Sequence, residues 1–245
     1  DNRELVDRDH PAPDPRRRLR EDLEAVNRIL GRQYHAVVGN PPYITVKDAA
    51  LNAAYRERYT SCHMKYSLGV PFTERFFELA ITGNGQPAGY VGLITANSFM
   101  KREFGSKLIE QVLPRLDLTH VVDTSGAYIP GHGTPTVILF GRHRAPVGDT
   151  VRTAMGIKGE PSTPDNPALG FVWSAIVEQI DRAGSESDFV SVGDTPRVTF
   201  SQHPWSIGGG GTAELKEQID AAGIEVFGAR TVAMGFVGIS PAADV

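Results

Sequence analysis

A short apolar run stops abruptly at two prolines. The run is Tyr34 to Gly39, and Asn40, Pro41 and Pro42 follow it directly. Proline fixes its own φ angle and has no backbone N–H to donate, so no regular element continues through these residues. A short apolar run that ends at turn-forming residues is typical of a buried parallel strand opening into a loop. We therefore expect a strand over 34–39 that ends at Asn40.

Helices and strands alternate after this strand. Apolar spacing predicts a helix that begins after Pro71, with Phe72 and Phe76 facing the core. A buried strand is expected over 89–96, and a helix over 101–113 that ends at Pro114.

Two further strands, over 118–123 and 136–141, complete the pattern. The loop between them is too short for a crossover helix, so the pair should be antiparallel. The order predicts an α/β fold: the second half of a doubly wound, Rossmann-like sheet, mostly parallel with a terminal antiparallel hairpin.

The flanking regions are expected to be helical. Residues 16–30 place Leu19, Leu23, Val26 and Leu30 on one helix face. Beyond Gly148 a proline-rich loop precedes an expected helix over 173–183, with Trp173, Ile176, Val177 and Ile180 on one face. A run of four glycines, 208–211, precedes a further expected helix over 212–222. We expect 1–150 to be the main domain, 151–228 an α-rich extension and 229–245 the start of a further region.

Composition excludes several classes of protein. The chain of 245 residues is 40% hydrophobic and 22% charged, it has no apolar run of membrane-spanning length, and its N-terminus is too charged to begin a secretory signal. We expect a cytoplasmic protein with no membrane partner. Its single cysteine, Cys62, allows no internal disulfide, and no His/Cys spacing suggests a metal site.

Charge is unevenly distributed along the chain. Residues 1–150 hold 19 Lys and Arg against 17 Asp and Glu, whereas residues 151–245 hold 6 against 12. Neither part is a basic platform for nucleic acid, so any contact with DNA phosphates must be local or lie outside this sequence.

The four residues Asn40, Pro41, Pro42 and Tyr43 suit methylation of an exocyclic amino group. The adenine amino nitrogen is a poor nucleophile because its lone pair is delocalised into the ring. Two fixed acceptors for its N–H groups allow it to become tetrahedral: the Asn40 side-chain oxygen and the Pro41 carbonyl, which the successive prolines hold rigidly. Tyr43 offers an aromatic face to a base that has left the duplex. This chemistry needs no covalent nucleophile, and Cys62 is better read as a small, partly buried residue.

The chain resembles a known family at these positions. Residues 34–43, 89–99 and the 121–141 hairpin resemble the catalytic half of class I S-adenosylmethionine-dependent, adenine-specific DNA methyltransferases. The segments 158–164, 172–176 and 203–206 with the glycine run resemble the PglX-type enzymes of bacteriophage exclusion and phage growth limitation.

The resemblance implies a function, a cofactor and partners. It implies transfer of a methyl group from S-adenosylmethionine to N6 of adenine in double-stranded DNA within a phage-defence system, with other defence proteins as further partners. Asn40, Pro41, Pro42 and Tyr43 would be catalytic, Asn40 would also contact the cofactor, and Tyr43 with Tyr128 would hold the target base. His132 is expected to be a turn residue rather than a proton shuttle.

One expected part of such an enzyme is missing before Asn40. No glycine-rich turn for the cofactor's methionine portion occurs in the 39 preceding residues. We expect the chain to be a fragment, inactive alone, with residues 229–245 opening a target-recognition region. The alternative is a permuted order of motifs, in which the 208–211 glycine run serves the cofactor.

Two alternatives to adenine methylation stay open. The first is methylation of another substrate, because the same four residues occur in enzymes that methylate guanine amino groups of ribosomal RNA or a glutamine amide of release factors. The second is a non-catalytic scaffold within a defence complex, which the missing cofactor loop favours.

Overall fold

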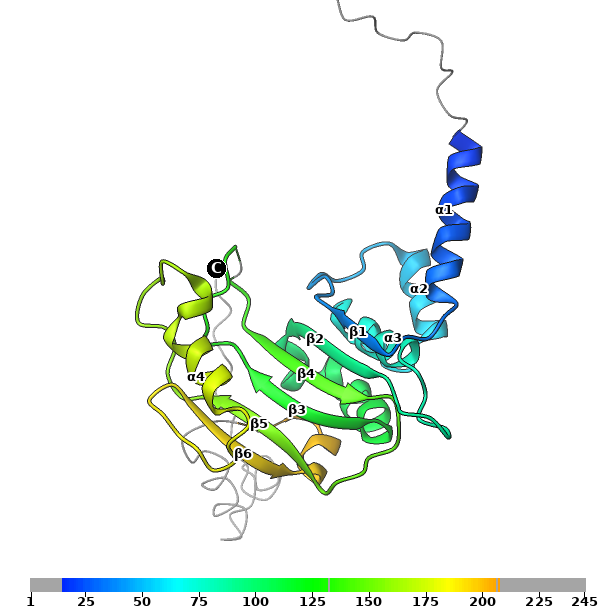
Figure 1. Ribbon diagram of the computed structural model, residues 1–245. Helices are drawn as coiled ribbons and strands as arrows, with labels where there is room; N and C mark the ends of the chain where they lie inside the picture. Colours follow the sequence, from blue (N-terminus) through cyan, green and yellow to red (C-terminus); the bar gives the residue numbers. More distant parts are fainter. Residues whose placement is uncertain (1–14, 132, 206, 208–245) are drawn as a thin grey trace, which may run out of the picture.

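Six strands form one sheet in the order β1-β2-β4-β3-β5-β6 (Figure 1). The computed structural model describes residues 15–131, 133–205 and 207. The strands are β1 (Ala36–Gly39), β2 (Tyr90–Ala96), β3 (Asp117–Asp123), β4 (Thr136–Arg142), β5 (Thr150–Gly156) and β6 (Val190–Pro196).

The directions of the strands follow from their pairing. β1 runs parallel to β2 and β3 runs parallel to β5, whereas β4 is antiparallel to both of its neighbours and β6 is antiparallel to β5. Four strands therefore share one direction, and the expected α/β class and the antiparallel β3–β4 hairpin are confirmed. Only two of the five pairings are parallel, because β4 folds back between β2 and β3 and β6 runs antiparallel to β5.

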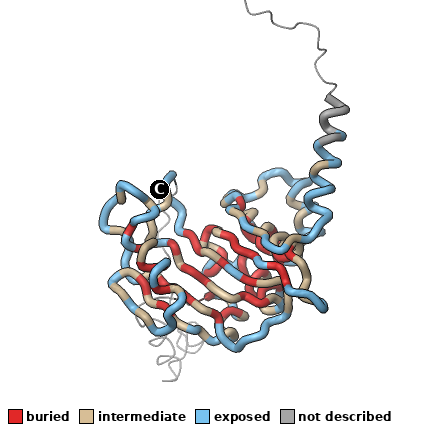
Figure 2. Tube along the Cα trace, viewed as in Figure 1, coloured by how far each residue is buried: buried red, intermediate tan, exposed pale blue. Residues whose placement is uncertain are grey.

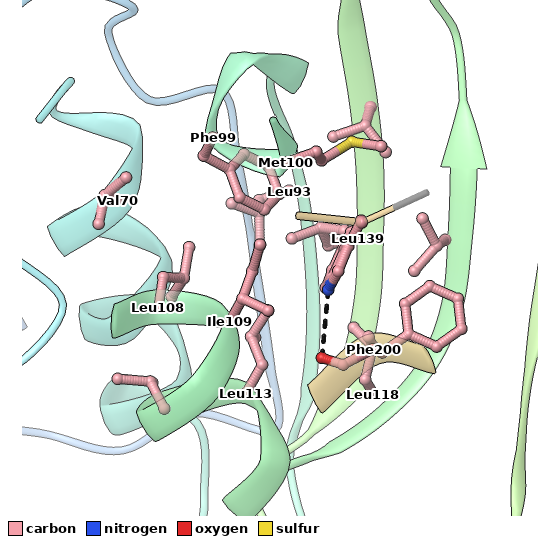
Figure 3. Packing of buried hydrophobic residues seen from close by; sticks show 14 of the residues in the cluster. Val70, Leu93, Phe99, Met100, Leu108, Ile109, Leu113, Leu118, Leu139 and Phe200 are labelled. Carbon is pink, nitrogen blue, oxygen red and sulfur yellow. Dashed lines mark hydrogen bonds between the residues drawn. The ribbon is translucent and has the colours of Figure 1, made fainter. Parts of the chain in front are cut away.

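The main core lies between one face of the sheet and two helical segments. Helix α3 (Gly69–Leu79) and the irregular helical segment 97–115 pack on the side chains of β2, β3 and β4 (Figure 3). Trp205 is 1% exposed and lies edge-on to the rings of Phe99 and Phe200, with its indole nitrogen donating to the Phe200 carbonyl oxygen at 3.2 Å. The chain beyond the sheet thus returns to complete this core.

A smaller core covers the other face of the sheet. Helix α4 (Phe171–Gln179) packs Val172 and Ile176 against Val122, Ala154 and Val192. Because Val121 belongs to the main core and Val122 to this one, the alternation along β3 places helices on both faces of the sheet. Figure 2 shows the buried residues concentrated in the strands, between these two layers.

The region after residue 150 differs from the expected α-rich extension. It contributes β5 and β6 to the same sheet, and α4 is its only α-helix among the described residues. β5 pairs with the free edge of β3, and its valine and alanine side chains are buried there, so the strand is stabilised by a neighbour that its local sequence does not reveal. The glycine run 208–211, the expected helix 212–222 and residues 229–245 lie outside the described residues.

Three predicted elements differ in detail. The helix expected over 101–113 is a succession of 3-10 turns and one π-helical turn, Leu108–Val112. A Cβ at Gly105 would lie 1.9 Å from the Phe99 carbonyl oxygen, so the chain packs too closely there for a regular helix. In α3 the buried side chains include Thr73 and Phe77, whereas Phe72 is only partly buried. In α4, Val177 is 59% exposed.

Two segments near the N-terminus also differ from expectation. β1 is an edge strand, and Val38 is 81% exposed, so the strand is not buried as its composition suggested. Helix α1 (Pro15–Leu30) extends away from the sheet (Figure 1), and its Leu23, Val26 and Leu30 side chains are exposed. Helix α2 (Ala49–Arg58) was not expected from the sequence, and its first turn is capped by the Asp48 carboxylate.

Replacing Leu139 on the central strand tests this packing. Leu139 is fully buried, and Leu139→Ala is expected to lower the free energy of unfolding of the chain by about 2–5 kcal/mol because it leaves a cavity. Urea denaturation followed by tryptophan fluorescence measures the change. Val177→Ala is the matched control, expected to change it by less than about 0.5 kcal/mol because that side chain is exposed. Equal effects of the two substitutions would contradict the assignment of the core.

Candidate active site

Residues 40–43 lie at the carboxyl end of β1, as predicted. β1 pairs in parallel with β2, with Gly39 opposite Leu93. The carboxyl ends of parallel strands are where open α/β sheets place their ligands. A Cβ at Gly39 would lie 2.7 Å from the Phe76 ring, so glycine lets the end of β1 approach α3 closely. The pairing of β1 with β2 and its close contact with α3 therefore fix the point at which residues 40–43 leave the sheet.

The four residues differ in exposure in a way that suits a binding loop. Pro41 is buried and anchors the loop, whereas Asn40 and Pro42 are exposed. Tyr43 is partly buried, and its hydroxyl donates to the Ile94 carbonyl oxygen of β2 at 3.5 Å. Burial also raises the pKa of the Tyr43 phenol, so the hydroxyl stays protonated at neutral pH.

The chain beyond Tyr43 is tied down by backbone hydrogen bonds. The Leu68 N–H donates to the Ile44 carbonyl at 2.8 Å, and Thr45 forms an antiparallel bridge with Ser67. The loop is thus held at both ends, by β1 and by the segment that leads into α3. A loop held at both ends can present Asn40 in a fixed orientation.

A hollow of about 590 Å³ lies beside these residues. Asn40, Pro41, Pro42, Tyr43 and Ile44 line it from one side, and Thr134 lines it from the β3–β4 loop. The Pro135 carbonyl accepts a hydrogen bond from the Asn97 N–H at 3.0 Å, which holds this end of the loop at the carboxyl end of β2. The hairpin therefore brings a second loop to the Asn40 site.

Tyr128 lies elsewhere in the β3–β4 loop. Its side chain is 36% exposed and is not among the residues that line the hollow. The neighbouring Gly126 carbonyl accepts a hydrogen bond from the Glu160 N–H at 2.9 Å, which ties this part of the loop toward α4. The structure does not bring Tyr128 together with Asn40. Thr134, which was not expected from the sequence, is the residue of this loop that lines the hollow. His132 lies outside the described residues.

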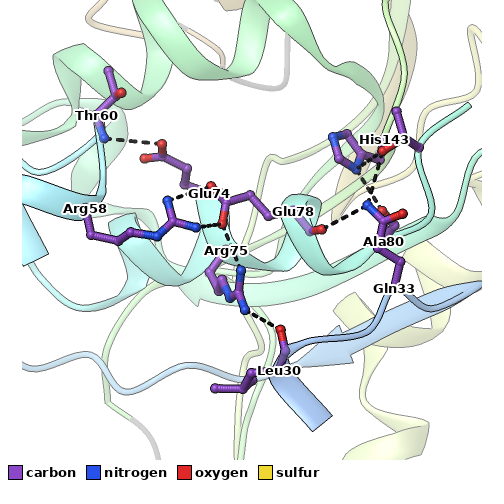
Figure 4. A network of polar contacts seen from close by, with 10 residues as sticks. Leu30, Gln33, Arg58, Thr60, Glu74, Arg75, Glu78, Ala80 and His143 are labelled. Atoms are coloured by element: carbon purple, nitrogen blue, oxygen red, sulfur yellow. Dashed lines mark hydrogen bonds and ion pairs between the residues drawn. The ribbon is translucent and has the colours of Figure 1, made fainter. Parts of the chain in front are cut away.

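A second hollow, of about 790 Å³, shares the Tyr43 side chain with the first. Lys65 lines it from one side, and Ser98 and Arg102 line it from the segment after β2. The loop that carries Lys65 is held against α3, because the Glu74 carboxylate accepts a hydrogen bond from the Thr60 N–H (Figure 4) and another from the Ser61 N–H. Tyr43 therefore separates two openings on the same edge of the molecule.

Arginines of α2 and α3 connect the helices near β1 in one network of hydrogen bonds and ion pairs. Arg75 donates to the Leu30 carbonyl at the end of α1 and to Glu78, which also pairs with Arg58 at the end of α2 at 2.6 Å (Figure 4). His143, just after β4, contacts the Ala80 carbonyl oxygen at 2.7 Å. The network fixes α1, α2 and α3 around the start of β1.

Cys62 lies in the main core. Its side chain is 5% exposed in the main core, as the sequence predicted for a small, partly buried residue. Burial raises the pKa of the thiol to about 11, and it also raises the pKa of neighbouring Tyr66 to about 12. Both groups are therefore neutral at physiological pH.

Two features of the part of the chain that the structure describes bear on metal binding and membrane crossing: its groups of metal-ligating side chains and its helices. No group of three His, Cys, Asp or Glu side chains there could hold a metal ion. No helix within the described ranges is both long and apolar enough to cross a membrane.

Comparison with known proteins shows which methylases this chain is similar to. Residues 13–129 match the family model of Eco57I restriction-modification methylases, a range that includes β1, the four-residue loop and the first half of the β3–β4 loop. The type IIG restriction endonuclease BpuSI has a similar fold, with a TM-score of 0.50 over 76% of this chain and 22% of its own, at 13% identity.

The chain is also similar to particular methyltransferases. It is 55% identical over 218 residues, 86% of its length, to the adenine-specific methyltransferase PglX of Streptomyces coelicolor. It is 29% identical over 150 residues, 55% of its length, to the type II methyltransferase M.PaeR7I of Pseudomonas aeruginosa. The resemblance to PglX-type methyltransferases is thereby confirmed. The chain spans only 18% of the length of PglX and 25% of that of M.PaeR7I.

The reactivity of Cys62 tests its assignment to the core. A thiol with a pKa of about 11 stays protonated below that pH, so at pH 8 iodoacetamide should alkylate Cys62 in the folded chain at least tenfold more slowly than in the urea-unfolded chain. Mass spectrometry measures the two rates. Equal rates would contradict both the burial and the raised pKa.

Proposed function

We propose that the protein transfers a methyl group from S-adenosylmethionine to N6 of adenine in double-stranded DNA, as part of a phage-defence system. The observation that carries the proposal is the placement of Asn40 to Tyr43 at the carboxyl end of β1, in a hollow that the β3–β4 loop closes with Thr134. The likeness to proteins named as adenine-specific and type II DNA methyltransferases supports DNA as the polymer.

The proposed chemistry rests on two acceptors for the adenine amino group. The Asn40 side-chain oxygen and the Pro41 carbonyl oxygen each accept one N–H, which concentrates the lone pair on nitrogen. S-adenosylmethionine, when bound, would supply an electrophilic methyl group to the amino nitrogen that Asn40 and Pro41 hold, with the thioether as the leaving group and one amino proton passing to solvent. Pro41 and Pro42 hold the acceptors rigidly because both φ angles are fixed.

Tyr43 is proposed to stack on the target base. Its hydroxyl bonds to Ile94, so the ring is held at the wall of the hollow. Stacking on an aromatic ring stabilises a base that has left the duplex. Tyr128 remains a proposed second contact for the base, from a position outside the hollow.

The described residues can bind the adenine amino group, but they offer few contacts for S-adenosylmethionine. In residues 15–131 and 133–205 no strand leads directly into a helix through a tight glycine-rich turn, the device that binds nucleotide cofactors in related sheets. Asn40 is the one described residue that we place against the methyl donor, because it is exposed at the mouth of the hollow. No other contact with the cofactor is assigned to this chain.

The division of the chain is also part of the proposal. Residues 1–150 would form the catalytic half, with 151–228 as a family-specific extension that includes β5 and β6. Residues 229–245 would begin target recognition. Other defence proteins are proposed as partners of the whole protein.

The role of Asn40 is tested in the intact polypeptide in which this chain occurs. Asn40→Ala is expected to lower methyl transfer to DNA by about 100-fold or more, since it removes one aimed acceptor, while the thermal transition moves by only a few degrees because the side chain is exposed. Transfer of a radioactive methyl group measures the rate. Asn84→Ala, an exposed asparagine in the turn before β2, is the matched control with parental activity. More than about a tenth of parental activity in Asn40→Ala would refute the role.

The stacking role of Tyr43 needs the ring rather than the hydroxyl. Tyr43→Phe should keep most activity, whereas Tyr43→Ala should lose about 1–3 kcal/mol of binding to the extruded base. DNA with 2-aminopurine at the target position reports extrusion by a rise in fluorescence. Parental fluorescence and turnover in Tyr43→Ala would make Tyr43 a packing residue, and Tyr128→Ala would then be the next substitution to measure.

A further inference from the structure

Two cations face the second hollow on the far side of Tyr43 from Asn40. Lys65 and Arg102 line this hollow together with Ser98 and the Tyr43 ring. Both residues are exposed, and in the part of the chain that the structure describes neither the Lys65 ammonium nor the Arg102 guanidinium forms a hydrogen bond or an ion pair. Cations of protein surfaces that line a hollow without a partner are available to an anionic ligand.

The backbone that carries each cation is fixed. On one side, Met64 next to Lys65 has a positive φ of 49°, and its carbonyl oxygen accepts a hydrogen bond from Arg56. The Thr45–Ser67 bridge holds the same segment beside Tyr43. A left-handed residue of this kind is uncommon outside glycine and asparagine, so the turn at Met64 is imposed by these contacts.

The segment with Arg102 is fixed by the chain that follows β6. The Trp205 N–H donates to the Met100 carbonyl at 2.8 Å, and the His203 ring contacts the Arg102 carbonyl oxygen at 3.1 Å. His203 also donates its backbone N–H to Glu110. The backbone on both sides of the hollow is therefore held in place, and both charged side chains are exposed.

One carboxylate lies near these cations. Glu103 also lines the hollow, with its side chain 62% exposed, and its nearest basic partner is the His63 ring, 3.9 Å away. The lining thus has two cations against one anion. The local charge is positive although the chain carries a net charge of -4.

We infer that this hollow binds phosphates of the target strand next to the extruded adenine, through Lys65 and Arg102. The inference rests on the proposed function, because a base held between Asn40 and Thr134 leaves its own strand passing Tyr43. The two hollows share Tyr43, so the ring would separate the base from its backbone. Phosphate contacts of this kind position a strand and do not read its sequence.

Salt dependence of DNA binding by the intact protein tests the inference. Lys65→Gln and Arg102→Gln should each lower the slope of log K against log salt by about 1 on duplexes that contain the target adenine, and the double variant by about 2. Glu103→Gln should instead tighten binding, since it removes the anion from the lining. Arg115→Gln is the matched control: Arg115 is exposed and lies just before β3, at the amino end of the strands.

A neutral phosphate locates the contact. A methylphosphonate placed in turn at each phosphate flanking the target adenine should weaken binding by the parent at one or two positions. The same methylphosphonate should not weaken DNA binding further in the Lys65→Gln, Arg102→Gln double variant. It should weaken binding by Arg115→Gln as much as it weakens binding by the parent.

The outcomes separate this inference from the proposed function. If the parent methylates DNA but the double variant keeps the parental slope and the parental methylphosphonate pattern, the inference is wrong and the function stands. If the parent methylates no DNA, the function itself fails, and the inference fails with it. Circular dichroism of each variant confirms that the fold is kept.

Discussion

The position of β4 between β2 and β3 is the constraint on which the rest of the structure depends. β4 pairs along its whole length with β2 and along most of it with β3, and its Leu139 is fully buried. Because β4 runs against its neighbours, the loop that precedes it returns to the edge where β1 and β2 end. This places Thr134 in the same hollow as Asn40. The antiparallel strand β4, inserted among the four strands that share one direction, thus brings the β3–β4 loop to the loop that follows β1.

The site depends on contacts that hold exposed residues in place. Pro41 is buried, Ile44 accepts a hydrogen bond from Leu68, and the Tyr43 hydroxyl bonds to Ile94, so the Asn40 side chain is presented from a loop fixed on both sides. Preorganised acceptors of this kind act without reorganising during the reaction. The same Tyr43 ring forms a wall of the cationic hollow of Lys65 and Arg102, which links the proposed base pocket to the proposed strand contact.

Much of this arrangement could be predicted from local sequence, and the rest could not. The β strands at 36–39, 90–96, 117–123 and 136–142 follow from apolar runs between turn residues, and Asn40 could be placed at a strand end because the prolines stop β1. The exposure of Val38, the joining of β5 to β3 and the position of Thr134 depend on which strands become neighbours, which no local pattern states. The roles of Asn40, Tyr43 and Tyr128 stay predictions until activity is measured.

The central claim is that the Asn40 site methylates adenine in DNA. Methylome sequencing of a bacterial host that carries the intact gene, beside a host that carries the Asn40→Ala version, tests it most directly. N6-methyladenine is expected at one recurring sequence motif in the first host and none at that motif in the second. Unmethylated DNA in both hosts, with methylation appearing instead on ribosomal RNA or on a protein glutamine, would contradict it.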